Sequence, residues 1–224
     1  MDSHIASVAQ PSNKEKLLSE GLRVVHKSGF GASSVRDIVQ AAGVPQGSFT
    51  NHFASKEAFG MEILARYIEA TDAVVAATLR NDTLAPLQRL RGWIEGYIEY
   101  LKEDDCRMGC LLGNLSAEAS EHSEVIRNRV ARAFTEYQEA VAYCLRAAVA
   151  AGELVSTTDT HEIAGFIISS LQGSILIAKA QRNSAPIERF LRLLFSRVLQ
   201  PVGAIRVPSR GRTPTMPASR RRSN

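Results

Sequence analysis

Residues 46–52 carry several side chains that donate or accept hydrogen bonds and bear no fixed charge. They are Gln46, Ser48, Thr50, Asn51 and His52. An amide can pair with two atoms of an adenine edge, and a hydroxyl can contact several bases, in the major groove of DNA. These residue types therefore favour the reading of base edges, provided that a helix presents them outward.

The residues around this segment predict two short helices joined by a tight turn, with the motif at about residues 34–53. Ser33 or Ser34 can cap the first helix, because a serine hydroxyl accepts a bond from a free backbone N–H. Gly43 suits a tight helix exit, and Pro45 suits the first turn of the next helix. The apolar residues that recur at helical spacing are Val35, Ile38, Val39, Ala42, Val44, Phe49 and Phe53. This pattern predicts a helix-turn-helix with its polar side chains outside.

The composition predicts a globular protein, with 45% apolar and 22% charged residues. No uninterrupted apolar run approaches the roughly 18–20 residues that cross a membrane. Residues 1–12 are polar and are expected to be disordered, and they contain no signal-peptide pattern. The odd number of cysteines (Cys106, Cys110 and Cys144) favours free thiols over a disulfide framework. A cytoplasmic location is the expectation.

The basic charge of the chain is concentrated at its C-terminal end. Residues 201–224 contain six of the 27 Lys and Arg residues and no acid, so residues 1–200 carry 21 basic and 23 acidic side chains. This Pro, Ser and Arg-rich segment predicts a basic disordered tail. The tail either adds non-specific attraction to phosphate or is solvated without a role. Recognition of DNA must therefore depend on the motif rather than on net charge.

The remaining chain shows helical periodicity throughout and no strand pattern or repeat. We predict an all-α fold of about nine helices, with Ser55 capping the first long one. The expected helices cover residues 14–28, the two helices of the motif, 56–79, 84–103, 110–119, 121–151, 159–181 and 186–199. The expected domains are a three-helix DNA-binding head at residues 13–60 and a helical ligand-binding and dimerisation body at residues 61–200.

The helix at residues 159–181 is apolar on nearly every side. Such a helix must be covered all round, and the helix at residues 186–199 can cover only part of it. A second copy of the same helix pair would complete a four-helix interface, so we predict a homodimer. The alternative is a central helix buried inside a monomer.

Residues 14–60 resemble the DNA-binding head of the TetR/AcrR family. The matching segments are Gly29-Phe30, Ile38–Val44, Gly47-Ser48-Phe49, Phe53 and Ser55–Ala58. The resemblance implies a homodimeric transcriptional regulator, most often a repressor, that binds a palindromic operator in double-stranded DNA. It also implies that a small molecule entering the body releases the DNA.

The resemblance implies a role for each matching position. Phosphate contacts are implied for Ser34, Arg36, His52 and Lys56. Base contacts are implied for Gln46, Ser48, Thr50 and Asn51. Two positions depart from the usual family pattern. Thr50 stands where an aromatic residue is common, and Asn51-His52 replaces a His-Tyr or Tyr-His pair. Both departures affect which operator sequence is recognised and leave the expectation of DNA binding unchanged. The alternative for His52 is that it packs beside Phe53.

Residues 109–118 and 173–179 resemble a TetR subgroup that includes N-ethylmaleimide-responsive and acrylate-responsive repressors. This resemblance implies that Cys110 is a reactive thiol and that Lys179 lies close to it. A nearby ammonium lowers the pKa of a thiol, and the thiolate is the nucleophile. The effector would then be an electrophile or unsaturated compound. The alternatives are a buried, inert Cys110 and a trigger that binds without cysteine chemistry.

Five aromatic residues lie on body helices that surround a ligand pocket in this family. They are Trp93, Tyr97, Phe134, Tyr137 and Phe166. Aromatic residues at helical spacing also suit an ordinary core, which is the alternative.

The sequence lacks the patterns that mark most enzymes. It shows no Gly-rich phosphate loop, nucleophile elbow or His/Glu metal spacing, so we expect no catalytic function, cofactor or metal site. A helical protein-interaction module without sequence-specific DNA binding is the remaining alternative. It would not explain the exposed polar residues between Gln46 and His52.

Overall fold

The computed structural model describes residues 11–118 and 123–199 of the 224-residue chain. The predicted basic tail at residues 201–224 lies outside the described residues, as does the predicted disordered N-terminus apart from Pro11 and Ser12. Ser12 caps the first helix by accepting a hydrogen bond from the backbone N–H of Glu15.

The described residues form nine α-helices and no strand, which confirms the predicted all-α fold. The helices are α1 (Asn13–Ser28), α2 (Val35–Ala42), α3 (Gly47–His52), α4 (Lys56–Ala77), α5 (Pro86–Lys102), α6 (Leu111–Glu118), α7 (Glu124–Ala150), α8 (Thr160–Gln181) and α9 (Ala185–Leu193). A π-helical turn, Leu194–Val198, follows α9.

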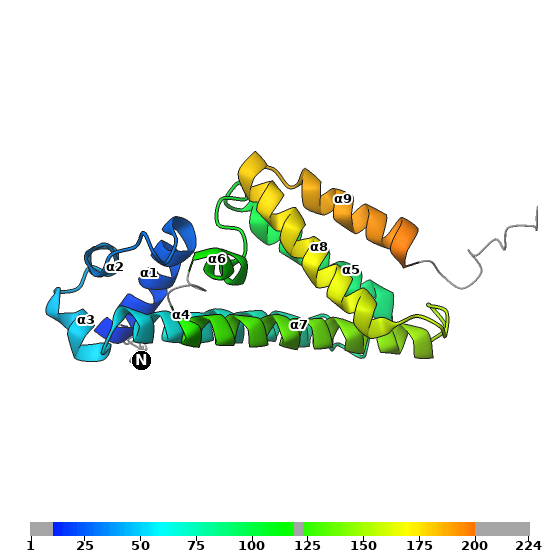
Figure 1. Cartoon of the computed structure of the whole chain (residues 1–224), viewed down its shortest axis with the longest axis horizontal. Coiled ribbons are helices and arrows are strands. Elements are labelled where there is room, and N and C mark those ends of the chain that lie inside the picture. Colours follow the sequence, from blue (N-terminus) through cyan, green and yellow to red (C-terminus); the bar gives the residue numbers. More distant parts are fainter. Residues whose placement is uncertain (1–10, 119–122, 200–224) are drawn as a thin grey trace, which may run out of the picture.

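The first three helices form a head at one end of an elongated molecule (Figure 1). Helices α4 and α7 lie side by side along its length, and α5, α8 and α9 pack at the opposite end. The short helix α6 lies between α1 and the body helices, so it connects the two ends of the molecule (Figure 1).

The turn between α2 and α3 has the capping that its sequence predicts. Ser34 caps α2, and its hydroxyl and backbone exchange hydrogen bonds with Asp37 in a capping box. Gly43 ends α2 in the left-handed conformation with φ 62°. Helix α3 begins at Gly47, so Pro45 lies before the helix rather than in its first turn.

Aromatic packing joins the head to α4. The ring of Phe59, on α4, lies 5.3 Å from that of Phe49 and 5.0 Å from that of Phe53. Phe59 is fully buried, and it also packs against α1 at Gly21. A β-carbon at Gly21 would lie 2.3 Å from Cζ of Phe59, so only glycine lets α1 approach the ring this closely.

Helix α8 leaves part of its apolar surface uncovered. Leu176 is 67% exposed, and Ile177 and Phe166 are about half exposed. Leu193 of α9 is exposed as well. Helix α8 is also long and apolar enough to cross a membrane by length and composition, although polar residues interrupt its apolar sequence. Its packing against α7 and α9 makes it part of the helical body.

We expect Gly21→Ala to lower the free energy of unfolding by about 1–3 kcal/mol, because the added methyl group overpacks the contact with Phe59. Urea unfolding of the purified protein measures this change. Gly92→Ala is the matched control, because Gly92 lies in the middle of α5 with open space around it. It should stabilise the protein by about 0.5–1 kcal/mol. Equal effects of the two substitutions would contradict the packing argument.

Candidate nucleic-acid interface and body cavities

The outer face of α3 carries most of the predicted base-reading residues. Gln46, Thr50, Asn51 and His52 are all exposed. Gln46 is the N-cap residue of α3, and the Thr50 hydroxyl donates to the carbonyl oxygen of Gly47 within the helix. These hydrogen-bonding side chains are therefore accessible on the surface, as direct readout in the major groove requires.

Ser48 is the exception, and its predicted outward position is wrong. Its side chain is only 7% exposed, and its hydroxyl accepts a hydrogen bond from the amide of Asn13 at 3.4 Å. In a helix of six residues, Ser48 and Phe49 both fall on the side that packs against α1. Sequence periodicity could not resolve the facing of so short a helix.

Some of the side chains predicted to contact phosphate are exposed, and others are already hydrogen-bonded within the protein. Arg36 is exposed at the start of α2, whereas the Ser34 hydroxyl is engaged with Asp37 at 2.7 Å. The ammonium of Lys56 donates to the carbonyl of Phe30 at 2.5 Å and lies 4.7 Å from the centre of its ring. Burial lowers the pKa of Lys56. Lys56 thus holds the loop between α1 and α2, a contact that the sequence did not reveal.

The first of two body cavities has a volume of about 450 Å³ and is named here the tyrosine cavity. Its walls include Trp93, Tyr97 and Tyr137, three of the residues predicted to line a pocket. The cavity is also lined by Arg23, His26, Tyr67, Thr71, Tyr100, Cys110 and Gln172. Because Arg23 and His26 belong to α1, a helix of the head forms part of the wall.

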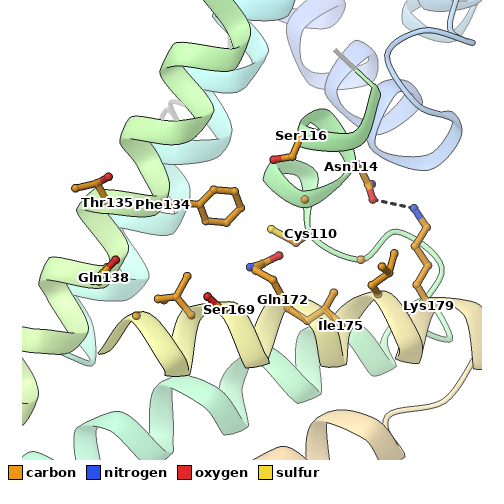
Figure 2. Close-up of a pocket in the computed structure, with 16 residues that line it drawn as sticks. Cys110, Asn114, Ser116, Phe134, Thr135, Gln138, Ser169, Gln172, Ile175 and Lys179 are labelled. Atoms are coloured by element: carbon orange, nitrogen blue, oxygen red, sulfur yellow. Dashed lines mark hydrogen bonds between the residues drawn. The ribbon is translucent and has the colours of Figure 1, made fainter. Parts of the chain in front are cut away.

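The second cavity, of about 590 Å³, lies between α6, α7 and α8 and is named here the lysine cavity (Figure 2). Phe134 and Lys179 line it, together with small residues of α8 such as Gly165 and Ser169. Cys110, Ile168 and Gln172 line both cavities, so these residues separate one from the other.

Cys110 lies in this shared wall and is 6% exposed. The hydroxyl of Tyr67 donates to its sulfur at 3.8 Å. Lys179 lines the same cavity, but its ammonium donates to the side-chain oxygen of Asn114 at 3.0 Å. Figure 2 shows the sulfur directed away from this Lys179–Asn114 pair. Cys106 and Cys144 are also buried, and burial raises the pKa of both thiols.

The hydroxyl groups of Tyr97 and Tyr137 are buried without a hydrogen-bond partner among the described residues. Burial raises the pKa of Tyr97 well above its usual value, and the neighbouring Cys110 and Tyr67 raise it further. Burial also raises the pKa of Tyr137 to about 12. Both phenols therefore keep their protons at neutral pH and can act as donors.

Phe166 does not line either cavity, so its predicted place in the pocket is wrong. Its side chain is 48% exposed on the outer face of α8. Because α8 is apolar on nearly every side, its sequence does not show which side faces the body.

His26 and Asn114 join the head to the body and were not predicted as functional. His26 is 4% exposed, and its Nε2 lies 3.1 Å from the carbonyl oxygen of Gly109, so this nitrogen carries the proton. The Asn114 amide donates to the carbonyl of Met108 at 3.0 Å and to that of His26 at 3.4 Å. A histidine on the apolar face of α1, one turn after Leu22, was the available signal.

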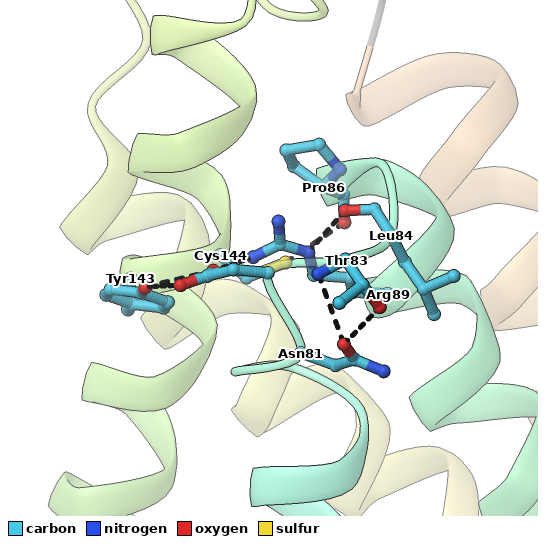
Figure 3. A network of polar contacts seen from close by, with 8 residues as sticks. Asn81, Thr83, Leu84, Pro86, Arg89, Tyr143 and Cys144 are labelled. Atoms are coloured by element: carbon cyan, nitrogen blue, oxygen red, sulfur yellow. Dashed lines mark hydrogen bonds and ion pairs between the residues drawn. The ribbon is translucent and has the colours of Figure 1, made fainter.

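A second polar cluster, at the turn between α4 and α5, joins this turn to α7 (Figure 3). Buried Arg89 pairs with Asp82 at 2.5 Å and donates to the carbonyl of Leu84 at 2.7 Å. The hydroxyl of Tyr143 on α7 donates to Asp82 at 2.9 Å. These bonds satisfy the buried guanidinium, and the cluster lies outside both cavities, so its role is structural.

A helix-turn-helix on an α-helical body with internal cavities defines a helical DNA-binding regulator. The family description "Bacterial regulatory proteins, tetR family" matches residues 17–60, and "Tetracyclin repressor-like, C-terminal domain" matches residues 86–194. The chain belongs to the TetR family, as its sequence predicted, and it is a DNA-binding transcriptional regulator. This family is a class of regulators and not a class of enzymes.

The chain is similar to several characterised regulators. It is 34% identical to the HTH-type transcriptional repressor DhaR of Mycobacterium sp. (strain GP1), over 86% of this chain and 95% of DhaR. It is 30% identical to the transcriptional regulator AcuR of Cereibacter sphaeroides, over 80% of this chain and 81% of AcuR. The crystal structure of reduced NemR from Escherichia coli superposes with a TM-score of 0.74 and 26% identity, covering 80% of this chain and 93% of NemR. The similarity to NemR supports the predicted subgroup.

We expect acid to weaken the fold through His26. Burial is the main cause that lowers the pKa of His26 below 6.5, so the folded protein binds this proton less readily than the unfolded chain. Stability is therefore constant above pH 6.5 and falls as the pH drops below it, by up to about 1.4 kcal/mol per pH unit from this group. The hydrogen bond to Gly109 and, to a smaller extent, Asp104 oppose this lowering of the pKa, and Lys179 adds to it.

Urea unfolding at pH 7.5 and 5.5 measures this dependence. His26→Gln keeps an N–H donor for Gly109 and should reduce the loss of stability between the two pH values. His52→Gln is the control, because His52 is exposed, and it should leave the pH dependence unchanged. A pH dependence that survives His26→Gln in full would exclude His26 as its source.

Proposed function

We propose that this regulator represses transcription in the cytoplasm as a homodimer bound to a palindromic operator, with residues 13–60 as the DNA-binding domain and residues 61–200 as the ligand-binding and dimerisation domain. The observation that carries the proposal is the exposed face of α3, where Gln46, Thr50 and Asn51 lie together outside the head. Exposed Arg36 supplies positive charge at the start of the neighbouring helix. A neutral reading surface beside a phosphate-binding residue is typical of helix-turn-helix proteins.

The uncovered surface of α8 and α9 supports the dimer. Phe166, Leu176, Ile177 and Leu193 are large apolar residues that the single chain leaves exposed. The alternative, a central helix buried in a monomer, does not explain this exposure. A two-fold axis through this surface would relate two α3 helices, which must lie roughly 34–36 Å apart to enter adjacent major grooves.

We expect Asn51→Ala to weaken binding to the operator selectively, with a loss of about 1–3 kcal/mol at one base pair. Arg36→Ala should weaken binding to every DNA sequence and reduce the salt dependence by about one unit of slope for each protomer bound. Fluorescence anisotropy with DNA from the promoter of the protein's own gene and with a scrambled duplex measures both.

Ser48→Ala is the matched control for base reading. Because Ser48 is buried against α1, its loss should leave the preference for operator over scrambled DNA unchanged. If Ser48→Ala removes this preference and Asn51→Ala does not, the orientation of α3 proposed here is incorrect.

We propose further that an event in the body releases the DNA, either a bound small molecule or a covalent adduct at Cys110. In the covalent route the sulfur of Cys110 forms a bond to the β-carbon of an unsaturated carbonyl compound, and the thiol proton is returned to the α-carbon. No oxidant is needed. The added group has to occupy one of the two cavities that Cys110 separates.

The contacts around Cys110 supply a route from the body to the head. Lys179 of α8 donates a hydrogen bond to Asn114 of α6, and Asn114 donates one to the carbonyl of His26 on α1. His26 in turn contacts Gly109, the residue before Cys110. An adduct that moves residues 109–114 therefore acts directly on α1. The head would then have one position that binds DNA and another that does not. The bound group can shift the equilibrium between them only by the difference in its binding free energy for the two.

We expect Cys110→Ser to abolish release of operator DNA by N-ethylmaleimide while leaving DNA binding intact. Mass spectrometry counts the adducts, and anisotropy measures release in the same samples. Cys106→Ser is the matched control, because Cys106 is buried outside both cavities and burial raises the pKa of its thiol. An unchanged response of Cys110→Ser to the reagent would contradict the covalent route and favour a non-covalent trigger.

A further inference from the structure

The tyrosine cavity contains two hydrogen-bond donors that the protein itself does not use. The hydroxyl groups of Tyr97 and Tyr137 are buried, and neither makes a hydrogen bond of normal length and angle among the described residues, although Cys110 and Tyr67 lie beside that of Tyr97 and Thr71 beside that of Tyr137. The neighbouring hydroxyl groups are occupied, since Tyr67 donates to Cys110 and Thr71 donates to the carbonyl of Tyr67. A buried polar group without a partner is unfavourable, and such groups are uncommon in folded proteins.

The cavity offers no free positive charge to an anionic ligand. Arg23 is the only lysine or arginine among its described lining residues, and its guanidinium is paired with Glu20 at 2.9 Å on the exposed side of α1. His26 donates its proton to Gly109, and burial lowers its pKa, so it remains neutral at pH 7. Lys179 lines the other cavity and is bound to Asn114. A buried carboxylate would therefore lack a counter-ion.

We infer that the tyrosine cavity binds a small, uncharged, mainly apolar molecule that carries a carbonyl or similar acceptor oxygen, and that Tyr97 and Tyr137 donate hydrogen bonds to this oxygen. The raised pKa values of both phenols keep them protonated, as donors must be. The cavity volume of about 450 Å³ lies within the range of small-molecule sites. The inference rests on the proposed function for its consequence, which is release of DNA.

The position of the cavity explains how an uncharged ligand acts on the head. Its wall includes Arg23 and His26 of α1 and also Cys110, which is adjacent to the His26 partner Gly109. A ligand that fills the cavity therefore contacts a helix of the head and the segment that holds it. No covalent step is required for this coupling.

The only tryptophan of the chain, Trp93, is buried and lines this cavity, so its fluorescence reports occupancy directly. Three probes of similar size separate the contributions to binding. They are 4-tert-butylcyclohexanone, its hydrocarbon analogue 1-tert-butyl-4-methylenecyclohexane, and 4-tert-butylcyclohexanecarboxylate. None of them adds to a thiol as an unsaturated carbonyl compound does.

We expect the full-length protein to bind the ketone at least tenfold more tightly than either the hydrocarbon or the carboxylate. An apolar cavity without available donors would give the opposite order, with the hydrocarbon tightest. Tyr97→Phe and Tyr137→Phe should each weaken ketone binding about threefold to tenfold and change hydrocarbon binding less than twofold. The double variant should prefer the hydrocarbon.

Tyr100→Phe is the matched control, because Tyr100 lines the same cavity but is exposed to solvent and its hydroxyl is not among the buried groups without a partner. It should bind the ketone as the unchanged protein does. The Tyr97 and Tyr137 variants should melt at no lower temperature than the unchanged protein, since the removed hydroxyls have no partner. A preference for the hydrocarbon or the carboxylate, or an equal effect of Tyr100→Phe, would overturn the inference.

Anisotropy with operator DNA separates this inference from the proposed function. If the protein binds its operator but shows no preference for the ketone, only the ligand class is refuted. If it binds the ketone through Tyr97 and Tyr137 but does not recognise operator DNA, the ligand site stands and the proposed function fails. Release of operator DNA by the ketone should persist in Cys110→Ser, in contrast to release by N-ethylmaleimide.

Discussion

The orientation of the DNA-binding head depends on the contact between α1 and the segment from Gly109 to Asn114. His26 donates to Gly109, and Asn114 donates back to the carbonyl of His26, so one buried and one half-buried hydrogen bond join the first helix to the body. Nearer the N-terminus of the same helix, Phe59 of α4 packs against Gly21. Helix α1 therefore contacts both an aromatic cluster and the polar segment next to the two cavities.

This arrangement gives different tasks to different parts of the protein. In the proposed function the head reads DNA with neutral side chains, and residues 13–60 add only a small positive charge, with six basic and four acidic side chains. Specific binding by a small neutral surface benefits from two copies, which the exposed apolar face of α8 can bring together. Both cavities lie in the body beside residues that contact the head, and in the proposed function a ligand there alters the spacing of the two heads.

The two proposed triggers would both act on residues 109–114. Cys110 forms part of the wall between the cavities, so an adduct on its sulfur and an uncharged ligand near Tyr97 and Tyr137 would press on the same segment. The separation of Lys179 from this sulfur by its bond to Asn114 gives the ammonium a structural role in the described state. The polar contacts of Asn114 then connect α8 to α1 directly.

The sequence by itself determined the helices, the helix-turn-helix, the Ser34 and Ser55 caps and the family, because these depend on local spacing and on residue types at helix ends. Tertiary structure decided which sides face inward. Ser48 turns in because Asn13 and α1 cover that side of α3, and Phe166 turns out because the body covers the opposite side of α8. Lys56 is directed to Phe30, 26 positions earlier in the chain, and the hydroxyls of Tyr97 and Tyr137 lack partners. These features arise from contacts between residues distant in the chain, and no local pattern records them.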